Sequence, residues 1–194
     1  GNNDLLTLTR PDVVEAIHRK YLEAGADIIE TNTFNATSIS QSDYHTQDAV
    51  RDINLQAAML ARRIADEFTK RTPNKPRFVA GSIGPTNKTC SISPNVNDPA
   101  YRAIDFDMLV TSYAEQIQAL LEGGVDALLI ETIFDTLNAK AAIYAAELVM
   151  AQQGVRVPLM LSLTVSDLAG RTLSGQTLDA FLASVSHADI FSVG

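Results

Sequence analysis

The feature that most constrains the fold of this chain is a unit that occurs twice: a helix end, a glycine, an aspartate, a short apolar strand and the dipeptide Glu-Thr. The first copy spans residues 23–34 and the second spans residues 122–134. From aspartate to glutamate the second copy is two residues longer. Because side chains alternate along a strand, this extension keeps the glutamate on the same face. Two copies of one unit predict a repeated β/α architecture.

The rest of the chain continues this alternation. Apolar strand patterns occupy residues 27–34, 77–83, 127–135, 157–165 and 189–194. Helical spacing of apolar residues occupies 9–25, with Thr9 as the expected N-cap, and then 47–72, 106–122, 136–153 and 177–187. Strict alternation predicts a parallel sheet with right-handed crossovers.

The ends of the strands favour one kind of parallel sheet over another. Polar residues follow each strand, and no Gly-x-Gly-x-x-Gly pattern does, which favours a (β/α)₈ barrel over a dinucleotide-binding sheet. A complete barrel needs roughly 250 residues, whereas this chain has 194. We therefore expect an α/β fold that is a partial (β/α)₈ TIM barrel.

Composition excludes several classes of function. The formal net charge of −8 leaves no basic stripe for nucleic acid or anionic membranes. No apolar run approaches the roughly 18–20 residues of a membrane span, and no signal peptide opens the chain. The single cysteine fits a reducing, cytoplasmic location. The absence of an initiator Met suggests a processed or truncated fragment.

Glu131 is the strongest candidate for chemistry. If Ala127, Leu129 and Glu131 face the barrel axis, the carboxylate sits at the mouth of the barrel, where it can bind an ammonium group or act as a base. The alternative is a solvated acid at a strand end. Asp135 is better interpreted as the N-cap of the next helix.

Two other strand ends supply weaker candidates. Thr31, Asn32 and Thr33 offer short hydrogen-bonding groups for a polar small molecule, although threonine is also a good strand former. The turn that begins at Gly84 can present backbone N–H groups to a carboxylate, or it is an ordinary turn. The polar stretch 88–105 is unusually long, as functional loops often are.

No metal site or nucleophile is expected from the residues. His18, His45 and His187 are scattered, and none lies four residues from another His or Cys. Cys90 has no partner in the sequence pattern. No nucleophile elbow and no P-loop is present. We expect neither catalytic nor metal-ligating residues in this chain.

A set of motifs adds a resemblance that covers essentially all 194 residues. They occupy residues 25–34, 84–87, 91–94, 130–136 and 170–177, the last reading Gly-Arg-Thr-Leu-Ser-Gly-Gln-Thr. The combination resembles the homocysteine-binding (homocysteine S-methyltransferase) domain of the cobalamin-dependent methionine synthase family. The resemblance implies that residues 1–194 form strands two to six of a single homocysteine-binding barrel.

What the resemblance implies for chemistry is specific. Zinc binds the homocysteine thiol and lowers its pKa, and the thiolate accepts a methyl group from methylcobalamin to form methionine. Methylcobalamin lies on another domain, and a folate-binding domain recharges it. Glu131 matches the acid that holds the substrate amino group. Thr31 is the best match for a substrate-facing threonine, with Thr33 as the alternative.

The departures from the family are equally specific. The three cysteine ligands of the family follow the sixth and eighth strands, and Cys90 matches none of them. The Gly-rich first strand is also missing. The fragment alone is therefore expected to hold no cofactor and to be inactive. Two alternatives remain: a non-catalytic, self-associating barrel fragment, and an unrelated TIM-barrel lyase or isomerase that uses Glu131 as its base.

Overall fold

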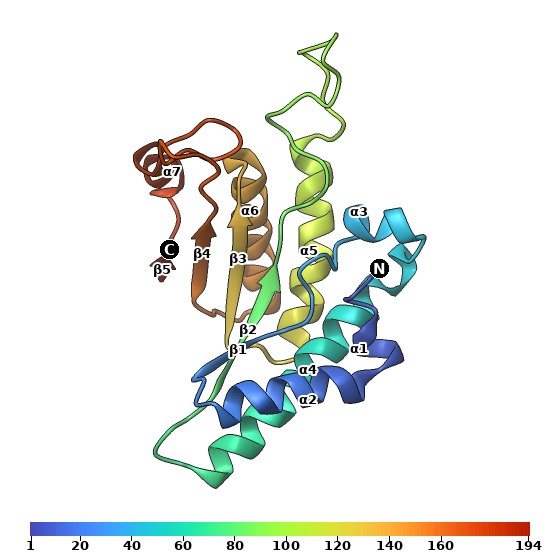
Figure 1. Cartoon of the computed structure of the whole chain (residues 1–194), viewed down its shortest axis with the longest axis vertical. Helices are drawn as coiled ribbons and strands as arrows, with labels where there is room; N and C mark the ends of the chain where they lie inside the picture. Colours follow the sequence, from blue (N-terminus) through green and yellow to red (C-terminus); the bar gives the residue numbers. More distant parts are fainter.

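The computed structural model describes all residues 1–194 and contains one parallel sheet of five strands in the order β1-β2-β3-β4-β5 (Figure 1). The strands are β1 (Ile28–Glu30), β2 (Phe78–Ile83), β3 (Ala127–Ile133), β4 (Leu159–Leu163) and β5 (Ser192–Val193). Neighbouring strands follow one another along the chain, as they do in a barrel. The expected partial (β/α)₈ barrel is confirmed.

Helices cover one face of this sheet, and the other face is open. The larger helices are α2 (Pro11–Glu23), α4 (Val50–Arg71), α5 (Phe106–Glu122), α6 (Thr136–Gln153) and α7 (Leu178–Val185). Alternate strand residues such as Val79, Leu128 and Leu161 are buried in the core against these helices. Of the residues between them, Ile28 and Phe78 point to the open face and are exposed, whereas Ala80 and Ser82 of β2 are buried. The open face is the side that lines the inside of a closed barrel.

Local signals place most helix ends. Asp105, Asp135 and Thr177 cap α5, α6 and α7, because each side chain accepts a hydrogen bond from a backbone N–H of the first turn. Gly154 ends α6 in the left-handed conformation, with φ of 66°, where a glycine costs little. No helix is both long enough and apolar enough to cross a membrane.

The prediction that Thr9 caps a helix is wrong. Thr9 belongs to the short helix α1 (Leu6–Thr9), and its hydroxyl donates to Leu5 O at 3.0 Å. Arg10 occupies the cap position of α2 without a side-chain hydrogen bond, and Pro11 begins the helix. Two short helical turns, α3 (Ser38–Gln41) and η1 (Ser42–Tyr44), follow β1, and the helix expected from residue 47 begins with the turn η2 (Gln47–Ala49) before α4.

The end of β3 is irregular. Its pairing with β4 shifts register between Ile130 and Ile133, and Thr132 has a positive φ of 56°. A β-branched residue rarely adopts this left-handed conformation. Such an irregularity changes the direction in which nearby side chains project.

Candidate functional site

Glu131 lies on the open face near the carboxyl end of β3, as the spacing predicted. Ala127, Leu129 and Glu131 are all partly exposed, whereas the intervening Leu128 and Ile130 are buried. The hydroxyl of Ser82, on the neighbouring strand β2, donates a hydrogen bond to Glu131 Oε1. A buried side chain therefore holds one carboxylate oxygen of an acid that remains accessible.

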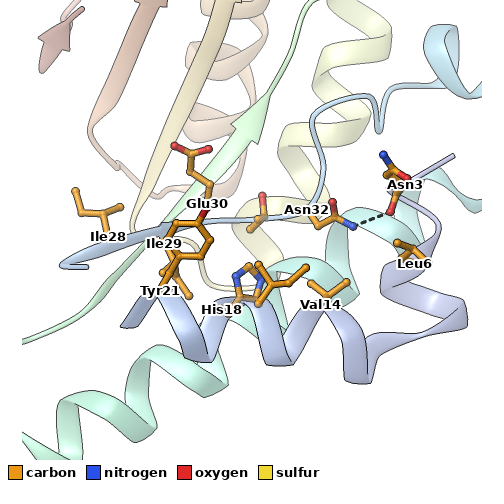
Figure 2. A pocket seen from close by; sticks show the side chains of 11 residues that line it. Asn3, Leu6, Val14, His18, Tyr21, Ile28, Ile29, Glu30 and Asn32 are labelled. Atoms are coloured by element: carbon orange, nitrogen blue, oxygen red, sulfur yellow. Dashed lines mark hydrogen bonds between the residues drawn. The ribbon is translucent and has the colours of Figure 1, made fainter. Parts of the chain in front are cut away.

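Glu30 is a second carboxylate on the same open face. In Figure 2 its side chain points away from helix α2, on the side of β1 opposite His18. Burial raises the pKa of the Glu30 carboxyl, and the negative charge of Glu131 raises that pKa further. The open face thus carries two acids whose charges repel, which favours a cationic group in front of it.

Thr31 and Thr33 are part of a buried hydrogen-bond network with Ser82. The Ser82 N–H donates to Thr31 Oγ1 at 3.0 Å, and Thr33 Oγ1 donates to Ser82 O at 2.7 Å. The two threonine hydroxyls lie 2.6 Å apart. Because each hydroxyl has one proton, Thr31 donates to Thr33 in this chain of bonds. Gln116 of α5 completes the network by donating to Thr33 O at 2.8 Å.

This network limits what the two threonines can offer a ligand. Thr33 is fully buried and Thr31 is 4% exposed. Both protons are used within the chain, so only acceptor lone pairs remain. Asn32, between them, points to the other side of β1 and donates to Asn3 O at 2.9 Å (Figure 2). The hydrogen bonds of Thr31 and Thr33 to Ser82 therefore join β1 and the segment after it to β2.

Gly84 is placed by packing. Its N–H donates to Phe34 O at 3.1 Å, so this N–H is not free to bind a substrate carboxylate. A Cβ atom at position 84 would lie 2.4 Å from Phe34 O and 2.9 Å from the Phe34 ring. Glycine is required here because the loop after β1 crosses directly over the end of β2.

Asp135 organises the rim beside Glu131. It is 2% exposed and accepts from Leu137 N at 2.9 Å, which confirms the expected helix cap. It also accepts from the backbone N–H of Ser91 at 3.1 Å and from the Ser91 hydroxyl at 2.8 Å. The neighbouring Asn138 accepts from Cys90 N at 3.0 Å. These bonds attach the long loop 88–105 to the turn that follows Glu131.

A second loop is attached to the same turn. Thr136 donates to the side chain of Gln176, and Ser174 N donates to Phe134 O at 3.2 Å. Both loops therefore meet at the turn that joins β3 to α6. In a barrel fold this is the face on which active sites are built.

Sequence reasoning missed Ser82 and Asn138. Ser82 lies in an apolar strand, and Asn138 lies inside an alanine-rich helix, so neither belongs to a motif. The one available signal was period two in β2, which puts Ser82 on the same face as Phe78. Position 138 carried no comparable signal.

The residues of this chain do not fit a zinc site. No group of three or more His, Cys, Asp or Glu side chains lies close enough to hold a metal ion. Cys90 is buried with its Sγ 3.8 Å from Ile104 O, and burial raises the pKa of its thiol, with Asp135 and Asp105 adding to the effect. A thiol held protonated in this way is a poor ligand.

Comparison with known proteins identifies the class of protein that this fold and rim define. The family model described as homocysteine S-methyltransferase matches residues 1–194, and the chain belongs to that family.

Solved structures share the fold. The metallated form of the homocysteine methyltransferase MmuM from Escherichia coli superposes with a TM-score of 0.77 at 20% identity, covering 97% of this chain and 64% of that chain. The apo form gives a TM-score of 0.73 at 19% identity, covering 100% and 65%. The chain thus spans less than two thirds of the length of these homocysteine methyltransferases.

Proposed function

We propose that this chain forms the amine-binding wall of the homocysteine site in a longer methyltransferase. The observation that carries the proposal is Glu131, an accessible carboxylate at the mouth of the sheet, held by Ser82 in a chain of the homocysteine S-methyltransferase family. Homocysteine is an amino acid with an ammonium group and a thiol. Ionised Glu131 binds the ammonium group through a charge-assisted hydrogen bond.

Each element of the site has a defined task in this proposal. Ser82 fixes one oxygen of Glu131, so the other is available to the substrate ammonium. The second acid, Glu30, increases the negative potential of the open face. Thr31 contributes an acceptor lone pair, while Thr33 and Gly84 hold the neighbouring backbone in place. The substrate thiol then points away from this wall.

The remaining chemistry lies outside the residues of this chain. We propose that residues 1–194 are strands two to six of one barrel domain, and that the longer protein supplies zinc ligands that lower the thiol pKa. Methylcobalamin is the proposed methyl donor, and a methionine synthase with cobalamin- and folate-binding domains is the proposed parent. A cytoplasmic location and the absence of nucleic-acid partners remain predictions from composition. Residues 1–194 alone should show no tight homocysteine binding by calorimetry.

Family membership weighs against one of the alternatives. An unrelated TIM-barrel lyase or isomerase with Glu131 as base does not agree with the match over residues 1–194. The open strand edges do favour self-association of the isolated chain, and light scattering on purified 1–194 measures it directly.

The test is the Glu131→Gln variant of the longer enzyme. Glutamine keeps an acceptor for Ser82 but removes the charge that pairs with the ammonium group. Loss of one partner of such a charge pair costs about 2–4 kcal/mol, or about 30- to 700-fold in binding. Steady-state kinetics should show this as a higher KM for homocysteine.

The matched control is Glu115→Gln, which removes an exposed glutamate from α5. It should leave KM unchanged. A Ser82→Ala variant should give an intermediate rise, because Glu131 keeps its charge and loses its orientation. An unchanged KM in Glu131→Gln would refute the proposed amine-binding role.

A further inference from the structure

The end of β3 contains a β-bulge, in which one strand has one residue more than its partner. Residues 130 and 133 of β3 pair with residues 161 and 163 of β4, so Glu131 and Thr132 together lie opposite Ser162. The positive φ of Thr132, 56°, belongs to this bulge. A β-branched residue is strained in that conformation, and such strain is concentrated at active sites and ligand-binding sites. The strain points to a function for the bulge.

The bulge turns Thr132 toward the open face of the sheet. In a regular strand Thr132 would share the core side with Ile130. It is half-buried instead, and Ile133, which would have faced the open side with Glu131, is 4% exposed and packs in the core. The alternation of β3 therefore shifts by one residue at Thr132, and the side chains of Glu131 and Thr132 lie on the same side of the sheet.

Ser162 of β4 faces this side too. Its neighbours Leu161 and Leu163 pack in or against the hydrophobic core, whereas Ser162 between them is half-buried. Neighbouring strands lie about 4.8 Å apart, and successive Cα atoms of one strand lie about 3.8 Å apart. Thr132 and Ser162 are therefore both neighbours of Glu131, one along β3 and one across to β4, within the span of one small ligand.

The hydroxyl groups of Thr132 and Ser162 differ from the others at this end of the sheet because their protons are free. Ser82 donates its proton to Glu131 Oε1, and Thr33 donates to Ser82 O at 2.7 Å. Neither Thr132 nor Ser162 makes a side-chain hydrogen bond within the chain, and both are half-buried. An ionised carboxylate only accepts hydrogen bonds, so it needs donors of this kind.

The proposed amino-acid substrate has a carboxylate that none of the contacts above accounts for. Glu131 pairs with the ammonium group, and the N–H of Gly84 is already donated to Phe34 O. The ammonium group and the carboxylate of an α-amino acid are attached to the same carbon atom. Once the ammonium group lies at Glu131, the carboxylate must therefore lie close beside it, where Glu131 repels it unless donors compensate.

We propose that Thr132 and Ser162 bind the α-carboxylate of the amino-acid substrate through hydrogen bonds from their hydroxyl groups. Glu131 and these two hydroxyls then recognise both charged groups of the substrate. The bulge makes this arrangement possible, because it presents Thr132 beside Glu131 on one strand. The pair also determines specificity, since a thiol that has the ammonium group but no carboxylate gains nothing from either hydroxyl.

The inference rests on the proposed function, because it takes the substrate to be an amino acid whose ammonium group binds Glu131. A second ligand separates the two proposals. Homocysteamine is homocysteine without its carboxylate, so it retains the ammonium group and the thiol. Removing the charge of Glu131 should weaken the binding of both ligands, whereas removing the hydroxyl of Thr132 should weaken that of homocysteine alone. Failure of either proposal is therefore recognisable by itself.

The first measurement is the Kd of the Thr132→Val variant of the longer enzyme, by calorimetry with homocysteine and by competition with homocysteamine. Valine keeps the β-branched shape and removes the hydroxyl. A hydrogen bond to a charged group corresponds to about 10- to 100-fold in binding, and the Kd for homocysteine should rise by that factor. The Kd for homocysteamine should stay unchanged, and Thr132→Ser should retain homocysteine binding. An unchanged Kd for homocysteine, or an equal rise for both ligands, would overturn the proposal.

The second measurement tests Ser162 independently through Ser162→Ala. This variant should also raise the Kd for homocysteine and leave that for homocysteamine unchanged, and an unchanged Kd for both would contradict the role of Ser162. The matched control is Thr111→Val, which removes an exposed hydroxyl from α5 and should affect neither Kd. Urea unfolding checks that each variant is folded. If Thr132→Val does not fold, Thr132→Ala removes the same hydroxyl without the β-branch and decides the question.

Discussion

The two strands that carry the dipeptide Glu-Thr near their carboxyl ends differ in structure beyond it. At the first, β1 stops at Glu30, and Thr31 turns its hydroxyl onto the backbone of Ser82. At the second, β3 continues through Glu131 to Ile133, and Thr132 takes a positive φ beside a register shift. The first copy thus joins two strands, whereas the strand of the second copy continues past its glutamate.

Sheet register explains the difference between the two glutamates. Glu30 is paired with Ala80, and Ser82 is paired with Leu129. Glu30 therefore lies beside Ala80, which is two residues before Ser82 on β2. Glu131 lies two residues after Leu129, the partner of Ser82 on β3. The two extra residues in the second copy move its glutamate toward the mouth of the barrel. Glu30 and Glu131 therefore face the same side of the sheet and differ in their position along the strands, with Glu131 nearer the mouth of the barrel.

The largest expected effect on stability tests whether Asp135 stabilises the fold by holding loop 88–105 as well as by capping α6. Asp135→Ala removes the α6 cap and both bonds from Ser91, so we expect a loss of about 2–4 kcal/mol of unfolding free energy. Asp105→Ala removes a cap alone, at an exposed position, and should cost about 1 kcal/mol. Urea unfolding of the two variants measures both. Equal losses would show that the attachment of loop 88–105 contributes nothing.

A smaller effect on stability is expected to distinguish Thr31, which follows β1, from Thr132, near the end of β3. Thr31→Val leaves the Ser82 N–H without its buried acceptor, which should cost about 1–3 kcal/mol. Thr132→Val changes a partly exposed side chain whose hydroxyl has no hydrogen bond within the chain, so the change should stay within about 0.5 kcal/mol. Valine has the shape of threonine, so packing is preserved in both. A similar cost at the two positions would remove the distinction drawn between the strand ends.

The smallest effect concerns Glu30. Because its pKa is raised in the folded protein, above the ordinary value of 4.5, the folded state holds this proton more tightly than the unfolded chain does. Ionised Glu30 therefore destabilises the fold once pH rises above the folded pKa, and the cost vanishes below about pH 4.5. Glu30→Gln should stabilise the protein at pH 7 by about 0.2–0.5 kcal/mol, since solvent screens this partly exposed group.

Unfolding midpoints of wild type and Glu30→Gln at pH 7 and pH 4 check this prediction. The two midpoints should converge at the lower pH. A stabilisation that persists unchanged at pH 4 would assign the effect to packing and not to charge.

The helices and strands were largely predictable from local patterns, and the failures have physical reasons. The cap at Asp135 and the stop at Gly154 depend on contacts within one turn of the helix, which sequence spacing encodes. Thr9 had the right residue type for a cap, but the preceding residues form a helix of their own. Thr9 therefore lies inside a helical turn, where its hydroxyl donates back to Leu5 O and not to the first turn of α2.

The candidate site was predictable in part. The period of two placed Glu131 on the open face, because strand geometry determines facing without any partner. The environment of Thr31, Thr33 and Gly84 was not predictable. Their partners are Ser82 of β2, Gln116 of α5 and Phe34 of the loop after β1.

The sequence alone therefore determined the alternation of strands and helices, the family motifs and the face on which each strand-end acid lies. These follow from covalent geometry and from contacts within a few residues. Only the tertiary structure decided that Thr33 is buried, that Ser82 holds Glu131 and that two loops meet at the turn that joins β3 to α6. Those results depend on hydrogen bonds between residues 40 to 83 positions apart in the chain, and no local pattern records such separations.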